Sequence, residues 1–440
     1  MLFKDISIIN ENFEVEDHRY VGVRGERIEL IADTMPEGDW GEIYNGEGKL
    51  LVPSFVDAHS HLPMVLMRGW AEGLPLMEWL QGCTFPFEAK MTADDIYWGT
   101  LFGIAEMLRF GIGSATEMYI MQDPLGRAFT EAQVKANFCL STVWMGSEGF
   151  YDLPQYAEAV KSFEKYHLTE NGRIRADFCL HAEYTSTEKI AKQVAETAAA
   201  HNAGLHVHVA ETHGEVDLCR KRHQRRSPVK YLCDCGIFEV PTTAAHCVHL
   251  DDEDISILAE KNVTVATCPK SNLKLASGVA PITALLEAGV NVALGTDSVA
   301  SNNNLNMIEE MRIFNLLQKG LDLDPTVVSP AQTLFAATRA GALSQQRDDC
   351  GLIKEGFKAD LAVFDVDKVY MKPVYNLLNN LVYSAQGTDV VMTMVDGNVL
   401  YREGEYSTLD IERIEYEVEK RRRRIIGDLE QDTIPELQIK

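Results

Sequence analysis

The sequence predicts an α/β protein in which a (β/α)8 barrel of the TIM type is combined with a small β-sandwich domain built from both chain ends. Three observations lead to this prediction. Short apolar runs alternate with longer helical patterns from residue 51 to residue 296, which is typical of βα units around a parallel sheet. Alternating apolar residues typical of half-buried strands occur before this region and return after it. No glycine-rich dinucleotide loop follows any expected strand, which favours a closed barrel over an open doubly wound sheet.

Eight strands and the helices between them account for the barrel. The amphipathic pattern of residues 94–109 and the alanine-rich stretch 187–201 predict two of the helices. Strands and helices in this alternation over roughly 300 residues match the usual size of a (β/α)8 barrel. The expected strands are residues 51–59, 113–118, 135–143, 177–181, 204–209, 242–246, 262–268 and 291–296.

The barrel is expected to be an insertion within the small β domain. The first β segment is too short to form a good sheet domain alone, so it needs strands from elsewhere in the chain. Asp396-Gly397 is a strong hairpin turn and predicts such strands near the C-terminus. The expected segments are 1–54 (first part of the sandwich), 55–350 (barrel), 351–405 (second part of the sandwich) and 406–440 (a C-terminal helical segment).

The composition is that of an ordinary soluble globular protein, with 440 residues of which 46% are hydrophobic and 24% charged. A net charge of −25 argues against a polyanion-binding surface, so no nucleic-acid partner is expected. No apolar run is long enough to span a bilayer and no signal peptide is evident, so no membrane partner is expected either. Nine scattered cysteines suggest reduced thiols and a cytoplasmic protein. The basic run 420–424 is expected to be a solvated helix face.

One short stretch, Phe55-Val56-Asp57-Ala58-His59-Ser60-His61, is the centre of the functional argument. Alternate side chains of a strand point to the same side, so His59 and His61 face one side together at the strand's end. Two neutral imidazoles converging in this way suit a borderline metal such as zinc. By itself a His-x-His pair is weak evidence, because such pairs more often serve hydrogen bonding.

Further polar side chains lie at the ends of other expected strands. Active sites of such barrels lie at the C-terminal ends of the strands, so these residues are expected to meet at one rim. In a conventional core they would be unpaired polar groups, which cost free energy. Their accumulation therefore predicts a metal site. The residues are His181, His206, His208, Glu211, His246 and Asp297.

The predicted ligands are His59, His61, His208 and Asp297. His206 shares a strand face with His208, but His208 is nearer the strand end; His206 remains an alternative or a neighbour behind the ligands. Three imidazoles and a carboxylate with an open position describe a catalytic Zn²⁺ site, one per subunit, although Fe²⁺ shares these ligands.

Three residues are the catalytic candidates around this site. Asp297 lies where it can accept a proton from the metal's water. His246 can stabilise the hydroxide or the developing oxyanion, and Glu211 can deliver a proton to the substrate.

These motifs resemble the metal-dependent amidohydrolase superfamily over nearly the whole chain. The segments that carry this likeness are 56–61, 208–212, 245–249, 295–298 and 356–361. Finer motifs at 75–80, 86–90, 269–275 and 301–307 resemble the 5′-methylthioadenosine/S-adenosylhomocysteine deaminase family. The resemblance implies an enzyme that replaces the 6-amino group of an adenosine-type nucleoside by oxygen and releases ammonia. It also implies a homo-oligomer.

The resemblance assigns substrate contacts as well. Glu88 matches a carboxylate that holds the ribose hydroxyls, Trp79 a residue beside the ribose, and His181 a substrate-binding histidine. Glu211 and Asp297 would also touch the substrate. Without the resemblance, Glu88 could be a helix-start carboxylate and Trp79 a core residue.

Two departures from the family pattern bear on the substrate. No arginine lies between Arg127 and Arg173, where relatives that accept S-adenosylhomocysteine hold its carboxylate; Lys135 is the alternative cation, although it cannot form a bidentate pair. This favours 5′-methylthioadenosine, adenosine or 5′-deoxyadenosine over S-adenosylhomocysteine. Glu183 also departs from the small residue expected there, and it is an alternative bridge to a second metal.

Two other function classes remain as alternatives. The first is an amidohydrolase acting on guanine, a pterin, cytosine or a chlorinated triazine, in which the strand-end chemistry would be unchanged. The second is a non-enzymatic assembly protein with this fold, against which the complete set of histidines and Asp297 argues.

Overall fold

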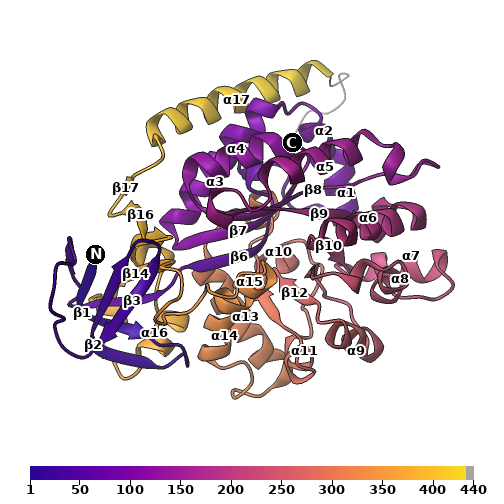
Figure 1. Ribbon diagram of the computed structural model, residues 1–440. Helices are drawn as coiled ribbons and strands as arrows, with labels where there is room; N and C mark the ends of the chain where they lie inside the picture. Colours follow the sequence, from indigo (N-terminus) through magenta and orange to yellow (C-terminus); the bar gives the residue numbers. More distant parts are fainter. Residues whose placement is uncertain (433–440) are drawn as a thin grey trace.

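Eight parallel strands form a barrel at the centre of the protein (Figure 1). The computed structural model describes residues 1–432; the end of the expected C-terminal segment, 433–440, lies outside the described residues. The barrel closes where the backbone N–H of Asp297 donates to the carbonyl of His59 at 2.9 Å. This confirms the predicted fold class. The strands are β6 (Phe55–Ser60), β7 (Ile112–Tyr119), β8 (Lys135–Leu140), β9 (Ile174–Ala182), β10 (Leu205–Val209), β11 (Thr242–His246), β12 (Thr264–Thr267) and β13 (Val292–Leu294).

Helices surround the barrel, and long ones such as α3 (Ala93–Arg109) and α6 (Glu188–His201) bury an apolar face. In α6 the hydroxyl of Thr187 accepts the N–H of Ile190 at the start, and Asn202 ends the helix in the left-handed conformation. The other helices of this layer are α4 (Gln122–Ala132), α5 (Pro154–Tyr166), α7 (His213–Arg222), α8 (Pro228–Asp234), α9 (Asp252–Glu260), α10 (Pro269–Lys274), α11 (Ile282–Glu287), α12 (Val299–Asn302), α13 (Met307–Asp322), α14 (Pro330–Ala337) and α15 (Arg339–Ser344).

Both chain ends contribute to a second, nine-stranded sheet beside the barrel. Strand β5 pairs antiparallel with β14, and this pairing joins the N-terminal strands to the C-terminal ones. The sheet has its own apolar core, to which Phe3, Leu51 and Leu361 contribute. The strands are β1 (Leu2–Ile9), β2 (Val15–Arg24), β3 (Arg27–Ala32), β4 (Ile43–Asn45), β5 (Lys49–Pro53), β14 (Leu361–Asp365), β15 (Val390–Val395), β16 (Asn398–Arg402) and β17 (Glu405–Tyr406).

The expected strand 51–59 is in fact two strands in two different sheets. Strand β5 belongs to the outer sheet and β6 to the barrel, with Ser54 between them. The N–H of Ser54 donates to the carbonyl of Asp360 at 2.9 Å, so the chain passes from one sheet to the other at this residue. Residues 50–60 are all buried, and a continuous apolar run therefore conceals the change of sheet.

Lys135 joins the barrel to the outer sheet. Its side chain is 3% exposed at the first residue of β8, and its Nζ lies 2.5 Å from Oδ1 of Asp360 and also contacts Asp396. The first residues of barrel strands lie at the end opposite the catalytic rim. Lys135 therefore does not replace a carboxylate-binding arginine, which corrects the alternative offered by the sequence.

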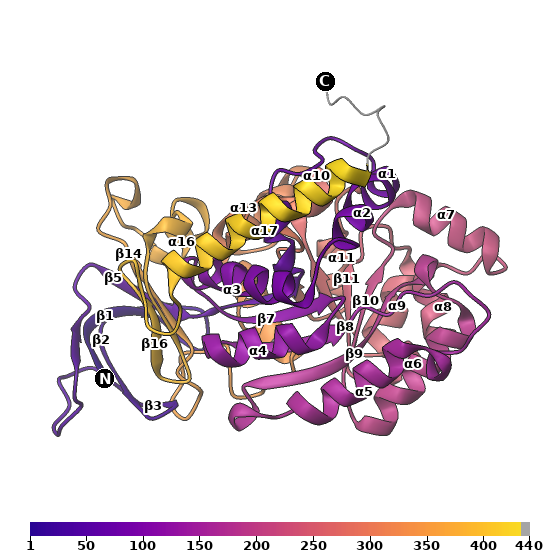
Figure 2. The same cartoon turned by 90° about the horizontal axis from the view of Figure 1, so that it is seen from above.

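The C-terminal helix α17 (Ile411–Asp432) lies along α3 on the outside of the barrel (Figure 2). Arg424 pairs with the buried Asp95 and donates to the carbonyl of Lys90 at 3.1 Å, and Arg421 lies 3.6 Å from Asp95. The expectation of a solvated basic face is therefore only partly right, because two arginines of the run turn inward. Arg422 and Arg423 both pair with Glu419 on the surface. Across residues 1–432, no helix combines the length and apolarity needed to cross a bilayer.

Candidate active site

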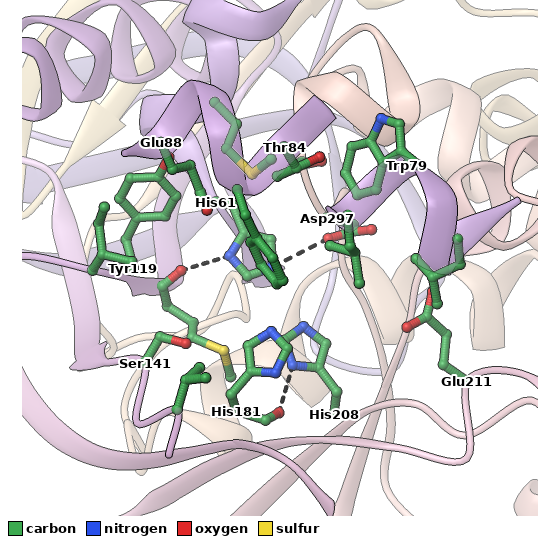
Figure 3. Close-up of a pocket in the computed structure, with 18 of the residues that line it drawn as sticks. His61, Trp79, Thr84, Glu88, Tyr119, Ser141, His181, His208, Glu211 and Asp297 are labelled. Atoms are coloured by element: carbon green, nitrogen blue, oxygen red, sulfur yellow. Dashed lines mark hydrogen bonds and ion pairs between the residues drawn. The ribbon is translucent and has the colours of Figure 1, made fainter. Parts of the chain in front are cut away.

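A pocket of about 700 Å³, including its open mouth, lies at the C-terminal ends of the barrel strands (Figure 3). Side chains at the ends of six strands, β7 to β11 and β13, and from the segment after β6 converge on it. His59 lies buried beside the pocket, 0% exposed. The lining includes most of the residues predicted from the sequence, namely His61, Trp79, Glu88, His181, His208, Glu211, His246 and Asp297.

The candidate ligand histidines are each oriented by a hydrogen bond at Nδ1. Nδ1 of His61 lies 2.5 Å from the carbonyl of Met118, and Nδ1 of His208 lies 2.7 Å from the carbonyl of His181. Ligand atoms of His59, His61 and His208 lie within 4.8 Å of one another. Hydrogen bonding at one ring nitrogen fixes the orientation of the ring and leaves the other nitrogen available to a metal.

His206 lies behind His59 and contacts it. Nδ1 of His59 is 2.8 Å from Nε2 of His206, and the two rings are stacked with centroids 5.0 Å apart. Of the two alternatives left open by the strand alternation, the structure places His208 on the pocket wall and His206 behind the cluster.

The donor set suits a divalent metal. Nε2 of His59 is buried without a hydrogen-bond partner, a state that costs free energy unless another group occupies the site. Burial lowers the pKa of His59 to about 3 and that of His208 well below its ordinary value, so both imidazoles are neutral and keep a lone pair. Nε2 of His59 is therefore a neutral nitrogen without a hydrogen-bond partner, surrounded by histidines and a carboxylate, and it is suited to bind a metal.

Asp297 supplies the carboxylate of the cluster. Its Oδ1 lies 3.5 Å from Nε2 of His59 and 3.3 Å from Nε2 of His61. Its Oδ2 accepts hydrogen bonds from the hydroxyls of Ser271 at 2.5 Å and Ser301 at 2.8 Å. The backbone of Asp297 has φ of 59°, a strained conformation that aims the side chain into the cluster as the chain leaves β13.

His246 and Glu211 lie next to each other in the pocket wall beside the histidine cluster. Nε2 of His246 is 3.9 Å from a carboxylate oxygen of Glu211, and its Nδ1 is 2.9 Å from Oδ1 of Asn272. Burial raises the pKa of Glu211, which favours a carboxyl able to carry a proton. Glu215 holds this strand end by accepting the backbone N–H groups of Ala210 and Glu211, each at 2.8 Å.

The segment between β6 and α3 covers the opposite side of the pocket. It contains α1 (Leu76–Trp79), the turn η2 (Leu80–Thr84) and α2 (Phe85–Glu88). Both Trp79 and Glu88 face the pocket, and burial raises the pKa of Glu88. The start of α3 is capped by Thr92 and Asp95, so Glu88 does not cap that helix; it is the last residue of the short helix α2.

Several pocket residues were missed by sequence reasoning. Tyr119 follows Met118 at the end of β7, one residue beyond the expected strand, and Tyr184 follows His181 by three positions. Thr84 and Ser141 also line the pocket. Of these residues only Tyr119 could have been found from the sequence, because it directly follows an expected strand and residues at the C-terminal strand ends of such barrels line the active site.

Two acidic residues near the motifs have partners outside the pocket. Asp57 accepts the N–H of Thr296 at 2.9 Å and its hydroxyl at 2.5 Å, which ties β6 to the end of β13. Glu183 is paired with Arg222 and His223 and does not line the pocket. The alternative in which Glu183 bridges a second metal beside the first is therefore wrong.

The comparisons with known proteins agree with this architecture. Residues 50–400 match the amidohydrolase family. The chain belongs to that family. A protein of Dictyoglomus thermophilum named 5-methylthioadenosine/S-adenosylhomocysteine deaminase is 40% identical over 96% of this chain and 98% of its own length. One of the same name from Pelotomaculum thermopropionicum is 41% identical over 90% of each chain.

Solved structures share the fold of this chain. A zinc-bound adenosine deaminase of Xanthomonas campestris superposes with a TM-score of 0.90 at 29% identity, over 97% of this chain and 98% of that one. An atrazine chlorohydrolase of Arthrobacter aurescens, at 22% identity and a TM-score of 0.88, covers 96% of this chain and 99% of its own and shares the fold alone. The resemblance to the amidohydrolases seen in the sequence is confirmed.

Proposed function

We propose that this amidohydrolase is a metal-dependent deaminase that converts an adenosine-type nucleoside to its inosine analogue and ammonia. The observation that supports it most is that Glu88 and Glu211 lie on opposite sides of one pocket, which Trp79 and His246 also line, around one histidine cluster (Figure 3). This arrangement offers a carboxylate for the ribose at one side and a proton carrier for the base at the other. The names of the relatives at about 40% identity point the same way.

His59, His61, His208 and Asp297 would hold a single divalent metal, for which we propose zinc, with ferrous iron as the alternative. A divalent metal bound by such ligands lowers the pKa of water towards neutrality and so supplies a nucleophile at neutral pH.

Side chains of the protein would donate and accept the protons of the reaction. Water's oxygen forms the new bond to the purine carbon, the carbon–nitrogen bond breaks, and the amino group leaves as ammonia. Glu211, whose pKa is raised by burial, donates a proton to the ring nitrogen next to that carbon. Asp297 accepts a proton from the attacking water and passes it to the amino group, which leaves as ammonia. The proton of the new hydroxyl returns to Glu211, and His246 stabilises the developing negative charge.

The remaining candidates would hold the nucleoside. The two oxygens of Glu88 match the spacing of vicinal ribose hydroxyls, and Trp79 offers a flat apolar surface beside them. His181 keeps Nδ1 2.9 Å from the hydroxyl of Thr185, which leaves Nε2 for the substrate.

The charge of the pocket favours a nucleoside with a neutral 5′ substituent. Within the described residues, neither lysine nor arginine lines the pocket, whereas three carboxylates do, those of Glu88, Glu211 and Asp297. The amino-acid carboxylate of S-adenosylhomocysteine would therefore lack a cation to pair with. We propose that 5′-methylthioadenosine, 5′-deoxyadenosine and adenosine are the preferred substrates.

Ammonia release by the zinc-loaded protein tests this function. The panel contains adenosine, 5′-methylthioadenosine, 5′-deoxyadenosine, S-adenosylhomocysteine, adenine and guanine. We expect the neutral nucleosides to react and S-adenosylhomocysteine to lag. Reaction of a free base alone would overturn the nucleoside assignment and favour another ring substrate.

We also propose a homo-oligomeric, cytoplasmic enzyme. All nine cysteines carry free thiols in the structure, which suits a reducing compartment. Light scattering of the purified protein would measure the number of subunits, and a monomer would contradict the proposal.

A further inference from the structure

Glu183 is a buried carboxylate without a role in the chemistry described so far. Its side chain is 1% exposed, and it begins the turn η5 (Glu183–Thr185) directly after β9. Nε and Nη2 of Arg222 donate to its two oxygens at 3.1 and 2.5 Å, and Nε2 of His223 lies 2.7 Å from Oε1. The His223 ring is itself stacked on Tyr231 of α8, with centroids 3.9 Å apart.

Helix α7 is held at both ends by these and related contacts. At its first turn, Glu215 accepts the backbone N–H groups of Ala210 and Glu211. At its last residue, Arg222 reaches Glu183. The helix therefore connects the strand end that carries the proton-transfer candidate Glu211 to the turn that follows His181.

The η5 turn carries or contacts three groups of the pocket wall. Tyr184, its second residue, lines the pocket. The hydroxyl of Thr185 lies 2.9 Å from Nδ1 of His181, and its carbonyl accepts the N–H of Trp144 at 2.9 Å, next to the pocket residue Val143. A displacement of this turn would thus move the side of the pocket that faces the nucleoside.

A metal would be the other explanation for these residues, because ligand atoms of Glu183, Cys219 and His223 lie within 4.8 Å of one another. Arg222 argues against it. Its guanidinium already pairs with both oxygens of Glu183, and a second cation at that carboxylate would be repelled by the first.

We propose that Glu183, Arg222 and His223 form an ionic clamp that positions His181 and Tyr184 for nucleoside binding. The inference rests on the proposed function, because it assigns these two side chains to the substrate. Glu183 is a positioning residue and touches neither substrate nor metal. Because the carboxylate is buried, loss of its partner leaves an uncompensated charge, and the turn has to move to solvate it.

Arg222→Met is the test variant and Arg220→Met its matched control. Arg220 lies on the same helix but pairs with Asp251, both partners being about half exposed. We expect Arg222→Met to raise KM for 5′-methylthioadenosine on the order of 10-fold, with kcat and metal content nearly unchanged, because the clamp governs binding geometry. Calorimetry with the inosine product should give the same weakening of Kd. The control should change neither constant.

A double-mutant cycle separates the clamp from general stability. Arg222→Met should raise KM most, because it leaves the buried Glu183 carboxylate without its main cation. Adding Glu183→Gln to Arg222→Met should lower KM again in part, because it removes the uncompensated charge. His223→Phe keeps the stacking on Tyr231 and should have a smaller effect.

Three outcomes would overturn the clamp: an equal rise of KM in Arg220→Met, a lower Tm with KM unchanged, or loss of the metal in Arg222→Met. The substrate panel measured with the wild-type protein tests the proposed function separately. If it acts on another ring substrate, that function is wrong, and the same comparison of variants with that substrate still decides the clamp.

Discussion

The rings of His59 and His206 are parallel to within 6°, and Nδ1 of His59 lies 2.8 Å from Nε2 of His206. The contact places a histidine directly behind a candidate metal ligand, from a strand across the barrel. It holds the His59 ring so that Nε2 points to the cluster, where that nitrogen has no hydrogen-bond partner in the protein.

Replacing His206 should weaken metal binding without removing a ligand. We expect His206→Phe to lower zinc affinity by about 10- to 100-fold, because loss of the partner behind a ligand frees its ring to rotate. Competition with a chromogenic chelator would measure this. His213→Phe, at an exposed position, is the control; unchanged affinity in His206→Phe would show that the contact does not orient His59.

Loss of Glu211, the proposed proton carrier, should leave metal binding unchanged. Glu211→Gln keeps the shape of the side chain but cannot supply the proton, so kcat should fall by about 10²- to 10⁴-fold at unchanged zinc content. Glu239→Gln, which removes a surface carboxylate paired with Lys261, is the control. Zinc loss in parallel with activity would move Glu211 into the ligand set.

The ribose contact should be specific to nucleosides. If Glu88 holds the ribose as proposed, Glu88→Ala removes two hydrogen bonds to a carboxylate, so kcat/KM for adenosine should fall on the order of 100-fold or more. Any activity on free adenine should change little. An equal loss for the base and the nucleoside would remove Glu88 from the ribose site.

Lys135, the buried cation at the end of the barrel opposite the pocket, should contribute to stability and should not affect substrate preference. Lys135→Met leaves the buried Asp360 without its cation and Asp396 with Lys358 alone, at 3.4 Å, and should lower the free energy of unfolding by about 3–5 kcal/mol. Lys165→Met breaks an exposed pair with Asp123 and should cost under about 1 kcal/mol. Urea unfolding measures both. A change in the ratio of S-adenosylhomocysteine to methylthioadenosine turnover would contradict this role.

Glu310 should make stability depend on pH. Burial raises its pKa to about 8, while the unfolded chain keeps the ordinary value of 4.5. The folded state therefore holds a proton that the unfolded state loses between pH 4.5 and 8. Its contribution to stability is complete below pH 4.5 and is lost as pH rises through 8, by up to about 1.4 kcal/mol per pH unit.

Glu310→Gln should flatten this dependence. Urea unfolding of the zinc-loaded protein at several pH values between 5 and 8 would compare the slopes of the two proteins. The neutral amide keeps one acceptor for the N–H of Lys270 or the amide of Asn302, so the variant should still fold. Identical slopes in both proteins would mean that Glu310 is ionised in the folded state.

Much of the barrel was predictable because its strands are short, apolar and regularly spaced. The limits of the prediction are clearest at Ser54, where an unbroken apolar run changes from the outer sheet to the barrel. Periodicity reports burial and does not report which sheet buries a residue. The basic run of α17 was misjudged for a similar reason, since Asp95, the partner of Arg421 and Arg424, lies more than 300 residues earlier.

The sequence by itself determined which residue types stand at the strand ends, and hence the candidates His59, His61, His208, Glu211, His246 and Asp297. Strand periodicity is local, and the closed barrel brings every strand end to one rim. Only the tertiary structure decided that His206 backs His59, that Lys135 lies at the opposite end, and that Glu183 pairs with Arg222. Each of these depends on which distant side chain satisfies a buried polar group, and that choice is made by packing, not by sequence spacing.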